Sequence, residues 1–525
     1  MSIAYTSIVN EIKSTGLKVA GTNKTQVLPA SRAGGALYVP DVQWFELGFP
    51  SDIFSRPGNH RAELPDLDHA QHLDMRFTFT VSGAPVELVP TPLFFEQIDA
   101  YDPSDPSHAF QVSYGDTALA ELFNKATYGT ARSMLKASNV ESDFIGKYGV
   151  GRPLPVGTHQ LYLPFLGGIF ANIGGVYAGK MRRNFTLMVR VPPTIIAGGA
   201  GTISVKVDVG VQGHRLHERD VAALESRYLA HAVECNFLQP HLTSRQQVLT
   251  VGTASNYIDL SSVEGVVAYH QIMIRPTGKT NVGNGRMSYL NIGDGNGAGL
   301  ELVSSNNNSL TGLISTQYLR QHGAAEQFDN DWLVQKPVYY LTYCKSINAA
   351  NRGLIHGGRY FKAQSSDRIR LHLPSASVAE VQTITFNTAP AAAGYYRLRF
   401  RGEESENLLG NATVATVKAA FEALKNARCK SLTAVFSAVA SAGTSLTVTL
   451  TDPEGTLDGS LLEVLPGTGF AAVASTARTT AAVQGLPATG TYDIDVYSFI
   501  YRTANFNGLR MIARDLSIAE PTHDQ

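Results

Sequence analysis

Short segments in which every second residue is apolar recur along most of the chain. Two examples are residues 75–81 and the run Phe185, Leu187, Val189 and Val191. A period of two is the pattern of a β-strand that buries one face. The segments are separated by turn residues, which include many of the 48 glycines and 24 prolines. This pattern predicts a mainly β protein built from many short strands.

The first part of the chain is interpreted as one β-domain. A chain of 525 residues is expected to form roughly three or four units. Residues 1–72 are expected to be mostly irregular, with an N-terminal arm at 1–29. A helical excursion at 116–136 and a connector helix at 216–234 complete a domain that spans 30–235. Its predicted strands are 75–81, 86–89, 93–101, 159–165, 184–191 and 202–211.

A second β-domain follows, at 236–380 and 487–518, and residues 519–525 form a C-terminal tail. A loop rich in glycine and asparagine is predicted at 277–308. The last two strands come more than a hundred residues after the others, which indicates that another unit interrupts this domain. The predicted strands are 247–251, 256–260, 266–275, 332–344, 357–362, 368–373, 491–502 and 509–513.

The interrupting segment, 381–486, has a different composition, rich in Ala, Thr and Gly. Its predicted helix at 414–426 carries Val417, Phe421 and Leu424 on one side, an amphipathic pattern. A ββαββ unit of about 100 residues can bury its own core. Domains are tolerated as insertions in exposed loops whose ends are close. The fold class is therefore two tandem β-sandwiches with a small inserted α+β domain. Its strands are predicted at 383–386, 395–402, 432–437 and 445–451, with a further strand at 461–465.

The two β-domains resemble the jelly rolls of double jelly-roll major capsid proteins from tailless icosahedral viruses. The second domain opens with Tyr257-Ile-Asp-Leu260, a glycine turn, and Gln271-Ile-Met-Ile-Arg275. It closes with Ile369-Arg-Leu-His-Leu-Pro374 and with residues 492–501. In the first domain, residues 89–99 and 160–165 are similar to family strands. The resemblance covers residues 73–518 apart from the insert.

The insert resembles a ββαββ module of phage structural proteins and bacterial surface proteins. Gly394-Tyr-Tyr-Arg-Leu-Arg-Phe-Arg-Gly402 is similar to its glycine-bounded strand. Residues 411–424 match its alanine-rich helix, and Leu446-Thr-Val-Thr-Leu450 matches a following strand. The chain departs from the module at Glu403-Glu404 and in the long tail before Gly490.

Together these resemblances imply a shell subunit of a membrane-containing bacteriophage. They imply a homotrimer with six rolls, which tiles an icosahedral capsid and contacts neighbouring capsomers, with the insert as an external tower. Penton and minor capsid proteins and an internal membrane are the further partners implied, and assembly is expected in the host cytoplasm. Two alternatives stay open: another virion component such as a spike, tail or host-adhesion protein, and a carbohydrate-active β-sandwich enzyme. The enzyme would need two converging carboxylates.

Charge and cysteine content restrict the partners. The formal net charge is −1, from 43 basic and 44 acidic residues, so no global basic field would attract nucleic acid. Sequence-specific binding of nucleic acid is not expected. Neither a secretory signal nor a membrane span is visible. Cys235, Cys344 and Cys429 are far apart and odd in number, which predicts free thiols in a reducing compartment.

Three glycine-containing or acidic motifs suggest ligand sites but fail on spacing. Gly278-Lys-Thr280 has Met273 where a phosphate-binding loop needs its first glycine. Gly293 to Ala298 fits a loose G-x-G-x-x-A pattern, but no convincing helix follows it. Asp294, Asn296 and Glu301 lack calcium-loop spacing, because Ser305 occupies the position of the final Glu. All three are interpreted as loop features.

Histidine and charge motifs do not complete a site either. His214-x-x-His217-Glu218 and His69-x-x-His72 lack a third metal ligand at a persuasive spacing. Asp329-Asn-Asp331 is interpreted as a turn, and Arg182-Arg183 as a solvated pair. The chain also lacks a GxSxG serine motif. The sequence therefore predicts a protein that is not an enzyme, with no catalytic residue, cofactor or metal site.

Overall fold

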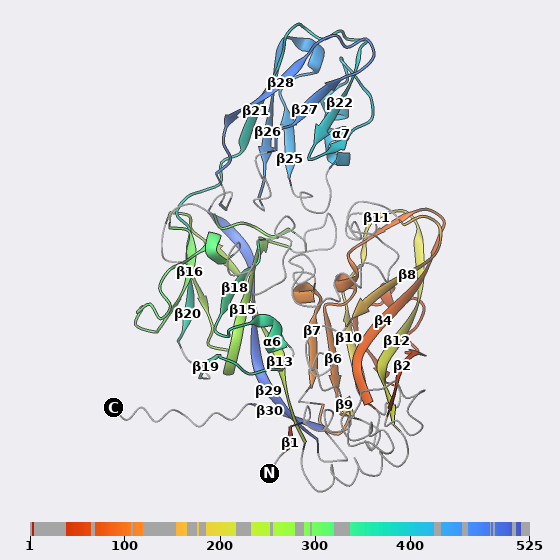
Figure 1. The fold of residues 1–525 in the computed structure, drawn as a ribbon, viewed down its shortest axis with the longest axis vertical. Helices are drawn as coiled ribbons and strands as arrows, with labels where there is room; N and C mark the ends of the chain where they lie inside the picture. Colours follow the sequence, from red (N-terminus) through yellow and green to blue (C-terminus); the bar gives the residue numbers. More distant parts are fainter. Residues whose placement is uncertain are drawn as a thin grey trace, which may run out of the picture.

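The computed structural model forms two β-sandwiches side by side, with a third unit above them (Figure 1). It describes residues 3–4, 38–64, 69–106, 109–118, 154–164, 176–177, 185–216, 233–252, 256–278, 288–293, 297–319, 337–351, 353–362, 364, 366–424, 432–453, 460–483, 485–486, 489–506 and 511–515.

The first roll consists of two main antiparallel sheets. One has the order β2 (Tyr38–Glu46), β12 (Thr202–Leu216), β4 (His69–Ser82) and β8 (Gly157–Pro164), and β9 (Val176–Tyr177) pairs with β4. The other has the order β3 (Gly58–Glu63), β10 (Thr186–Val191), β6 (Gln97–Tyr101) and β7 (Gln111–Tyr114). A short pair, β5 (Val86–Leu88) with β11 (Ile196–Gly199), lies next to these sheets.

Phenylalanine rings fill the space between the two main sheets. Phe77 and Phe79 extend inward from β4, and Phe54 comes from a 3-10 turn at Ile53–Ser55. Phe94 and Phe95 approach from a second 3-10 turn, Thr91–Phe94, and its end. The ring centroids of Phe77 and Phe94 are 5.2 Å apart in an edge-to-face arrangement, which aromatic pairs prefer. The alternating apolar residues of β4 thus supply the core that holds the sheets together.

The second roll also consists of two sheets. The larger has the order β1 (Ile3–Ala4), β13 (Val233–Leu249), β29 (Gly490–Phe506), β15 (Gly265–Pro276) and β18 (Tyr339–Thr342). β19 (Arg359–Phe361) pairs with β15, and β30 (Met511–Asp515) pairs with β29. The smaller sheet has the order β14 (Asn256–Asp259), β20 (Arg368–His372), β16 (Gly299–Val303) and β17 (Ile314–Ser315).

The central strands of the larger sheet are buried on both faces. On β15, Val267, Ile272 and Ile274 point into the second roll's own core. Tyr269 and Met273 on the same strand belong to the cluster that contains the first roll's phenylalanines. Eleven consecutive residues of β15 are buried, as expected for a strand with a packed layer on each side. The second roll therefore shares a continuous core with the first.

The insert has a separate core between two further sheets. One sheet has the order β25 (Thr433–Phe436), β26 (Ser445–Thr451), β21 (Glu380–Phe386) and β28 (Ala474–Thr480). In the other, β22 (Tyr395–Phe400) pairs with β23 (Glu403–Glu404), β24 (Leu408–Leu409) and β27 (Glu463–Pro466). Helix α7 (Val414–Leu424) buries Val417, Phe421 and Leu424 in this core.

The insert joins the second roll through a narrow neck between β20 and β29. Val378 and Val483 form an isolated antiparallel bridge, with N–H···O distances of 2.9 and 3.0 Å. The Ser377 N–H donates to the carbonyl of Leu486 at 2.9 Å. A separate contact joins the Asn291 N–H to the carbonyl of Pro453, also at 2.9 Å. The two ends of the insert are therefore adjacent, as an insertion into a loop requires.

The fold class predicted from the sequence is confirmed, and most predicted strands are present. The strand, strand, helix, strand, strand order of the insert corresponds to β21, β22, α7, β25 and β26. The further strand predicted at 461–465 is β27, whereas β28 was not predicted. The last predicted strands correspond to β29 and β30, although β29 is longer than expected.

Three expectations about local structure are wrong. The region 1–72 is expected to be mostly irregular, but most of its described residues belong to β1, β2, β3 and the start of β4. The predicted loop at 277–308 contains β16, every residue of which is buried. The connector helix predicted at 216–234 is wrong at both ends, because β12 extends to Leu216 and β13 begins at Val233. Pairing with distant strands, which local sequence does not reveal, stabilises all of these segments.

Only the first residues of the helical excursion predicted at 116–136 are described. A helical turn is present at 115–118, at the start of the excursion predicted over 116–136. Residues 119–136, and 217–232 of the connector, lie outside the described residues. Within 93–101, the strand is shorter than predicted, because Thr91–Phe94 form a 3-10 turn and β6 begins at Gln97.

Candidate functional site: the seam between the two rolls

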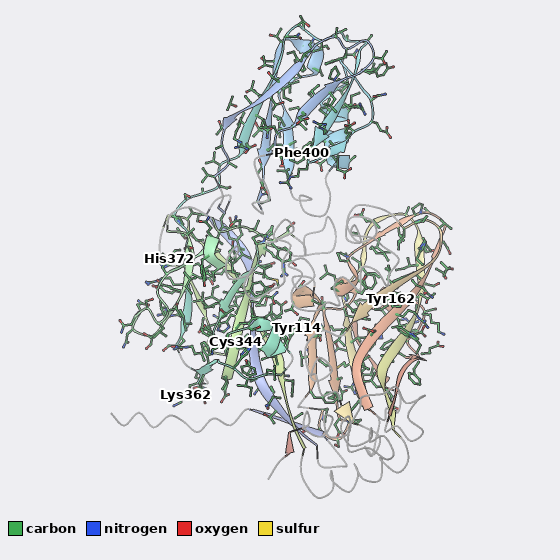
Figure 2. All side chains as sticks on the ribbon, in the orientation of Figure 1. Tyr114, Tyr162, Cys344, Lys362, His372 and Phe400 are labelled. Carbon is green, nitrogen blue, oxygen red and sulfur yellow. The ribbon has the colours of Figure 1, made fainter. Side chains whose placement is uncertain are left out.

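Buried polar and aromatic side chains gather where the two rolls meet. β7 of the first roll faces the large sheet of the second, and Figure 2 shows Tyr114 between them. The ring centroids of Tyr114 and Tyr497 are 5.2 Å apart. On the same face of the second roll, the ring of Tyr269 stacks on Phe499 at 4.3 Å. We refer to the face formed by Tyr269, Met273, Tyr497 and Phe499 as the seam.

A buried arginine lies in this seam. The side chain of Arg275, at the end of β15, is fully buried and pairs with the fully buried Asp495 of β29. Its other terminal nitrogen is 3.3 Å from Oδ1 of Asp116, which belongs to the first roll. The guanidinium carbon of Arg275 also lies 5.2 Å from the ring centroid of Tyr289. One cation thus contacts carboxylates from both rolls.

Hydrogen bonds fix both carboxylates. The Ser244 hydroxyl, on β13, donates to Oδ1 of Asp495. The Tyr497 hydroxyl donates to Oδ2 of Asp116 at 3.3 Å. The register of the sheet explains this grouping. Ser244 on β13 is directly opposite Asp495, and so is Met273 on β15. Arg275 lies two positions after Met273 and therefore on the same face. Three neighbouring strands therefore present these side chains on one face.

The electrostatics keep this arginine charged. Burial opposes the charged form, but Asp116 and Asp495 outweigh it and raise the pKa of Arg275 above its ordinary value. Removing Asp495 would leave the buried Arg275 with only the more distant Asp116, at 3.3 Å, to compensate its charge, which is strongly destabilising. An enclosed arginine held by two carboxylates cannot reach a substrate. The arrangement can fix the orientation of one roll against the other.

A serine–histidine pair of the second roll is also enclosed. Nδ1 of His270 lies 2.8 Å from the Ser498 hydroxyl, a distance that would suit nucleophilic catalysis. However, both residues are completely buried. Burial, followed by the charge of Arg359, lowers the pKa of His270 to about 3. The His270 ring is packed edge-on against Tyr343 and Phe361. It is a neutral core histidine that no substrate could reach.

Two residues singled out in the sequence, Cys344 and Glu301, are held in the folded structure by burial and by ion pairs respectively. Cys344 is a buried free thiol, labelled in Figure 2, and burial raises its pKa to about 11, so it is not reactive. Glu301 does not face a cation site. It pairs with Arg370 and with Nε2 of His372 at 2.6 Å. Glu301 is on β16, and Arg370 and His372 are on the neighbouring strand β20, so these side chains form a cluster on the smaller sheet of the second roll.

The register also brings together two histidine motifs that are far apart in sequence. In the pairing of β12 with β4, His214 is directly opposite His69, and Gln212 is opposite His72. Of the other weighed positions, Cys235 is in β13, Gly278 follows β15, Gly293 and Ala298 precede β16, and Ser305 follows β16. The remaining positions lie outside the described residues: Arg182, Arg183, His217, Glu218, Lys279, Thr280, Asp294, Asn296, Asp329, Asp331 and Cys429.

The described residues contain neither a metal-binding cluster nor a membrane-spanning helix. Among these residues, no group of three or more His, Cys, Asp and Glu side chains is placed to hold a metal ion. Within the same part of the chain, no helix is long and apolar enough to cross a membrane.

Local sequence patterns do not reveal the seam, because its members come from separate segments. In the sequence, Arg275 ends an apolar strand and Asp116 begins the helical excursion predicted at 116–136. The available signal was a charged residue directly after the apolar run Ile272-Met-Ile274. A second signal was Asp495, the one charged residue in the run 494–501, which is otherwise apolar or aromatic apart from Ser498. Charges inside buried strands are rarely left unpaired.

Comparison with known proteins supports the architecture. No family model matches the chain, and no curated protein matches its sequence. The crystal structure of PBCV-1 VP54, as fitted into a cryo-EM reconstruction of the virophage Sputnik, matches with a TM-score of 0.51 and 9% identity, covering 91% of this chain and 98% of that chain. A chain from a quasi-atomic model of the PBCV-1 virus capsid matches with a TM-score of 0.50, at the same identity and coverage. The chain therefore has the double jelly-roll fold of PBCV-1 VP54.

Proposed function

We propose that this protein is a major capsid protein, the repeating subunit of an icosahedral virion shell, and not an enzyme. The observation that carries the proposal is the fold match, which extends over 91% of this chain and 98% of PBCV-1 VP54. A match over nearly the whole of both chains includes both rolls and their arrangement. A fold alone does not establish a function, so the site must agree with it.

The interior of the molecule agrees with a structural role. The rolls share one core, and Arg275 bridges them through Asp116 and Asp495. The described serine–histidine pair, His270 and Ser498, is sealed from solvent. Such a subunit acts through its surfaces, by burying interfaces with its neighbours.

The finer features of the proposal follow the sequence resemblance. The subunit forms a homotrimer with six rolls, which contacts neighbouring capsomers, penton or minor capsid proteins, and an internal membrane of a tailless bacteriophage. The first roll is proposed to span 30–235, and the second roll 236–380 together with 487–518. The insert, 381–486, is proposed to be a module of the kind found in phage structural proteins and bacterial surface proteins. The insert is proposed to face the exterior. Its position at one end of the rolls, opposite β1 and β30, supports this orientation (Figure 1).

Mass measurement and imaging of the full-length protein test this function. Light scattering after size-exclusion chromatography should give three times the chain mass of 56.5 kDa. Electron microscopy of concentrated protein, or of particles from cells that also express partner proteins, should show pseudo-hexagonal capsomers or shells. A stable monomer that forms neither trimers nor shells under these conditions would refute the proposal.

A further inference from the structure

One face of the insert consists of uncharged side chains throughout. The outward residues of β21, β25, β26 and β28 are all Thr, Ser, Val or Ala, and they include Thr383, Val435, Thr447, Thr449 and Ala477. We call this surface the threonine face. Val435 is 63% exposed, the largest value among the described large apolar residues that are exposed. Next to it, across the strand pair, is Thr449.

The two charged residues of these four strands do not reach this face. Glu380 is buried on the inner side of β21. Arg478, on the edge strand β28, is exposed, but it is opposite the buried Gln382 in the register and so lies on the inner side of the sheet. Its Nε is 2.9 Å from the Glu380 carboxylate, so the two charges neutralise each other. The threonine face is therefore electrically neutral over four adjacent strands.

Some hydroxyl groups on and beside this face are already satisfied within the insert. The Thr479 hydroxyl donates to the carbonyl of Val381 at 3.0 Å and lies 3.3 Å from the Thr383 hydroxyl. The Ser437 hydroxyl accepts from the Thr447 N–H at 2.9 Å. A hydroxyl that is bonded locally costs less to remove from water. Threonine and valine methyl groups then provide the contact surface, as in the facing layers of a β-sandwich.

The other sheet of the insert has the opposite character. Outward residues of β22 include Arg397 and Arg399, which pair with Glu404 and Glu463 respectively. Charged rows of this kind keep exposed sheets soluble and discourage sheet-to-sheet association. The same small domain therefore has one charged, solvent-adapted sheet and one neutral sheet.

We propose that the threonine face contacts the threonine face of a second copy of this chain. Charge selects this occupant: an acidic or basic partner, or an anionic lipid surface, would find no complementary charge. Two copies of a neutral face meet without like-charge repulsion and without burying an unpaired charge. Two sheet faces covered with β-branched side chains can also pack at the sandwich spacing of about 10 Å.

The area of the face determines when this contact can form. Four strands about 4.8 Å apart, with residues about 3.3 Å apart along each, cover roughly 400 Å². A stable interface usually buries about 800 Å² on each partner. The contact is too small to hold free subunits together, but it can form where other interfaces already bring copies close. The inference therefore rests on the proposed shell function.

Symmetry places the contact within the shell. A face that pairs with itself needs a two-fold axis, whereas the subunits of a cyclic trimer are related by a three-fold axis. The threonine faces consequently join the inserts of two neighbouring capsomers. Free capsomers should have unpaired threonine faces, and assembled shells should have paired ones.

A cysteine at the centre of the face provides the test. Thr449→Cys should give covalent dimers on mild oxidation of assembled shells, seen on non-reducing gels, and several-fold fewer dimers in free trimers. Ala419→Cys, at an exposed position on α7, is the matched control and should give few dimers in either state. The unmodified chain corrects for its native cysteines. Intact shells in which Thr449→Cys gives no more dimers than Ala419→Cys would overturn the inference and leave the shell function standing.

A charge placed on the face gives an independent measurement. Val435→Glu and Val435→Lys should each lower the temperature at which shells dissociate, because each brings two like charges into the same contact. Shells co-assembled from equal amounts of the two variants should recover most of the loss. Equal dissociation temperatures for all three shells and the unmodified one would refute self-contact. Failure of the unmodified chain to form trimers or shells would count against the proposed function instead.

Discussion

The two junctions of this molecule are built in opposite ways. The first and second rolls meet across the seam, where aromatic rings and the Arg275 ion pairs are continuous with the core of the first roll. The insert has its own core and joins the second roll through the Val378–Val483 bridge and the Asn291–Pro453 hydrogen bond. In Figure 1 it stands above the rolls on this narrow neck.

This difference predicts two units of cooperativity. Elements that share a core unfold together, whereas a domain with its own core and a narrow connection can unfold separately. The rolls should therefore behave as one unit and the insert as another. Trp44 is useful here, because neither of the two tryptophans of the chain, Trp44 and Trp332, lies in the insert. Tryptophan fluorescence reports on the rolls alone.

The largest effect is expected from breaking the ion pairs of the seam. Asp495→Ala removes one carboxylate from the buried Arg275 and should destabilise the rolls by about 3–5 kcal/mol. Urea unfolding followed by tryptophan fluorescence measures this change. Glu96→Gln, which breaks the exposed pair with Arg190 in the first roll, is the control and should cost at most about 1 kcal/mol. Equal losses in the two variants would show that the seam pair has no special role.

Truncating a core side chain of the insert should cause a similar loss of stability, but in the insert and not in the rolls. Phe421 is fully buried, and its ring lies 5.4 Å from that of Phe400. Phe421→Ala should destabilise the insert by about 3–5 kcal/mol. Hydrogen–deuterium exchange should accelerate in peptides from 395–451, while the fluorescence midpoint of the rolls stays unchanged. A parallel loss of protection in the rolls would mean that the three units unfold together.

A pH-dependent effect should appear in the first roll. Burial raises the pKa of Asp99 to about 6, against an opposing hydrogen bond from Gln97. Because the folded-state pKa lies above the ordinary value of 3.8, the contribution of Asp99 to stability is fully present below about pH 4. It is lost as the pH rises through 6. The total change is about 3 kcal/mol.

Asp99→Asn isolates this contribution. Fluorescence-monitored urea unfolding at a series of pH values between 4 and 8 measures the stability of both proteins. The difference in unfolding free energy between them should vary with pH over the interval from about 4 to 6 and be flat above about 7. A difference that is constant over the whole range would show that this carboxyl titrates normally.

The smallest effect is expected from removing the insert. Replacing residues 379–482 with a short Gly-Ser linker keeps Val378 and Val483 and removes the Asn291–Pro453 hydrogen bond. The rolls should lose about 1 kcal/mol, the contribution of one hydrogen bond. The fluorescence midpoint of the shortened chain measures this loss. Misfolding of the rolls would contradict an independent insert and would remove the contrast between the two junctions.

Local sequence patterns predicted much of the fold. The alternation at 75–81 and 185–191 identified β4 and β10, because each strand buries one face. The spacing of Val417, Phe421 and Leu424 identified α7 for the same kind of reason. Strands without a clear pattern were missed. β2 contains a proline and mixed polar residues, and it is stabilised by its pairing with β12.

The seam could not be predicted in the same way. Nothing in the segment around Asp116 indicates that its carboxylate lies 3.3 Å from Arg275 of the other roll. The pair forms because the first roll is packed against a face of the second roll's large sheet. Likewise, the motif histidines His69 and His214 become neighbours through strand register. Register depends on the whole sheet.

The amino-acid sequence was sufficient to establish a mainly β chain with two large units and one inserted unit, because period and composition are local properties. It also showed threonines at every second position in the strand that became β26. The tertiary structure decided which of these surfaces are buried and which are exposed. It enclosed Arg275, Asp116 and Asp495 between the rolls, and it aligned the threonines of separate strands into one neutral face. Both outcomes require contacts between distant segments, which form only when the whole chain has folded.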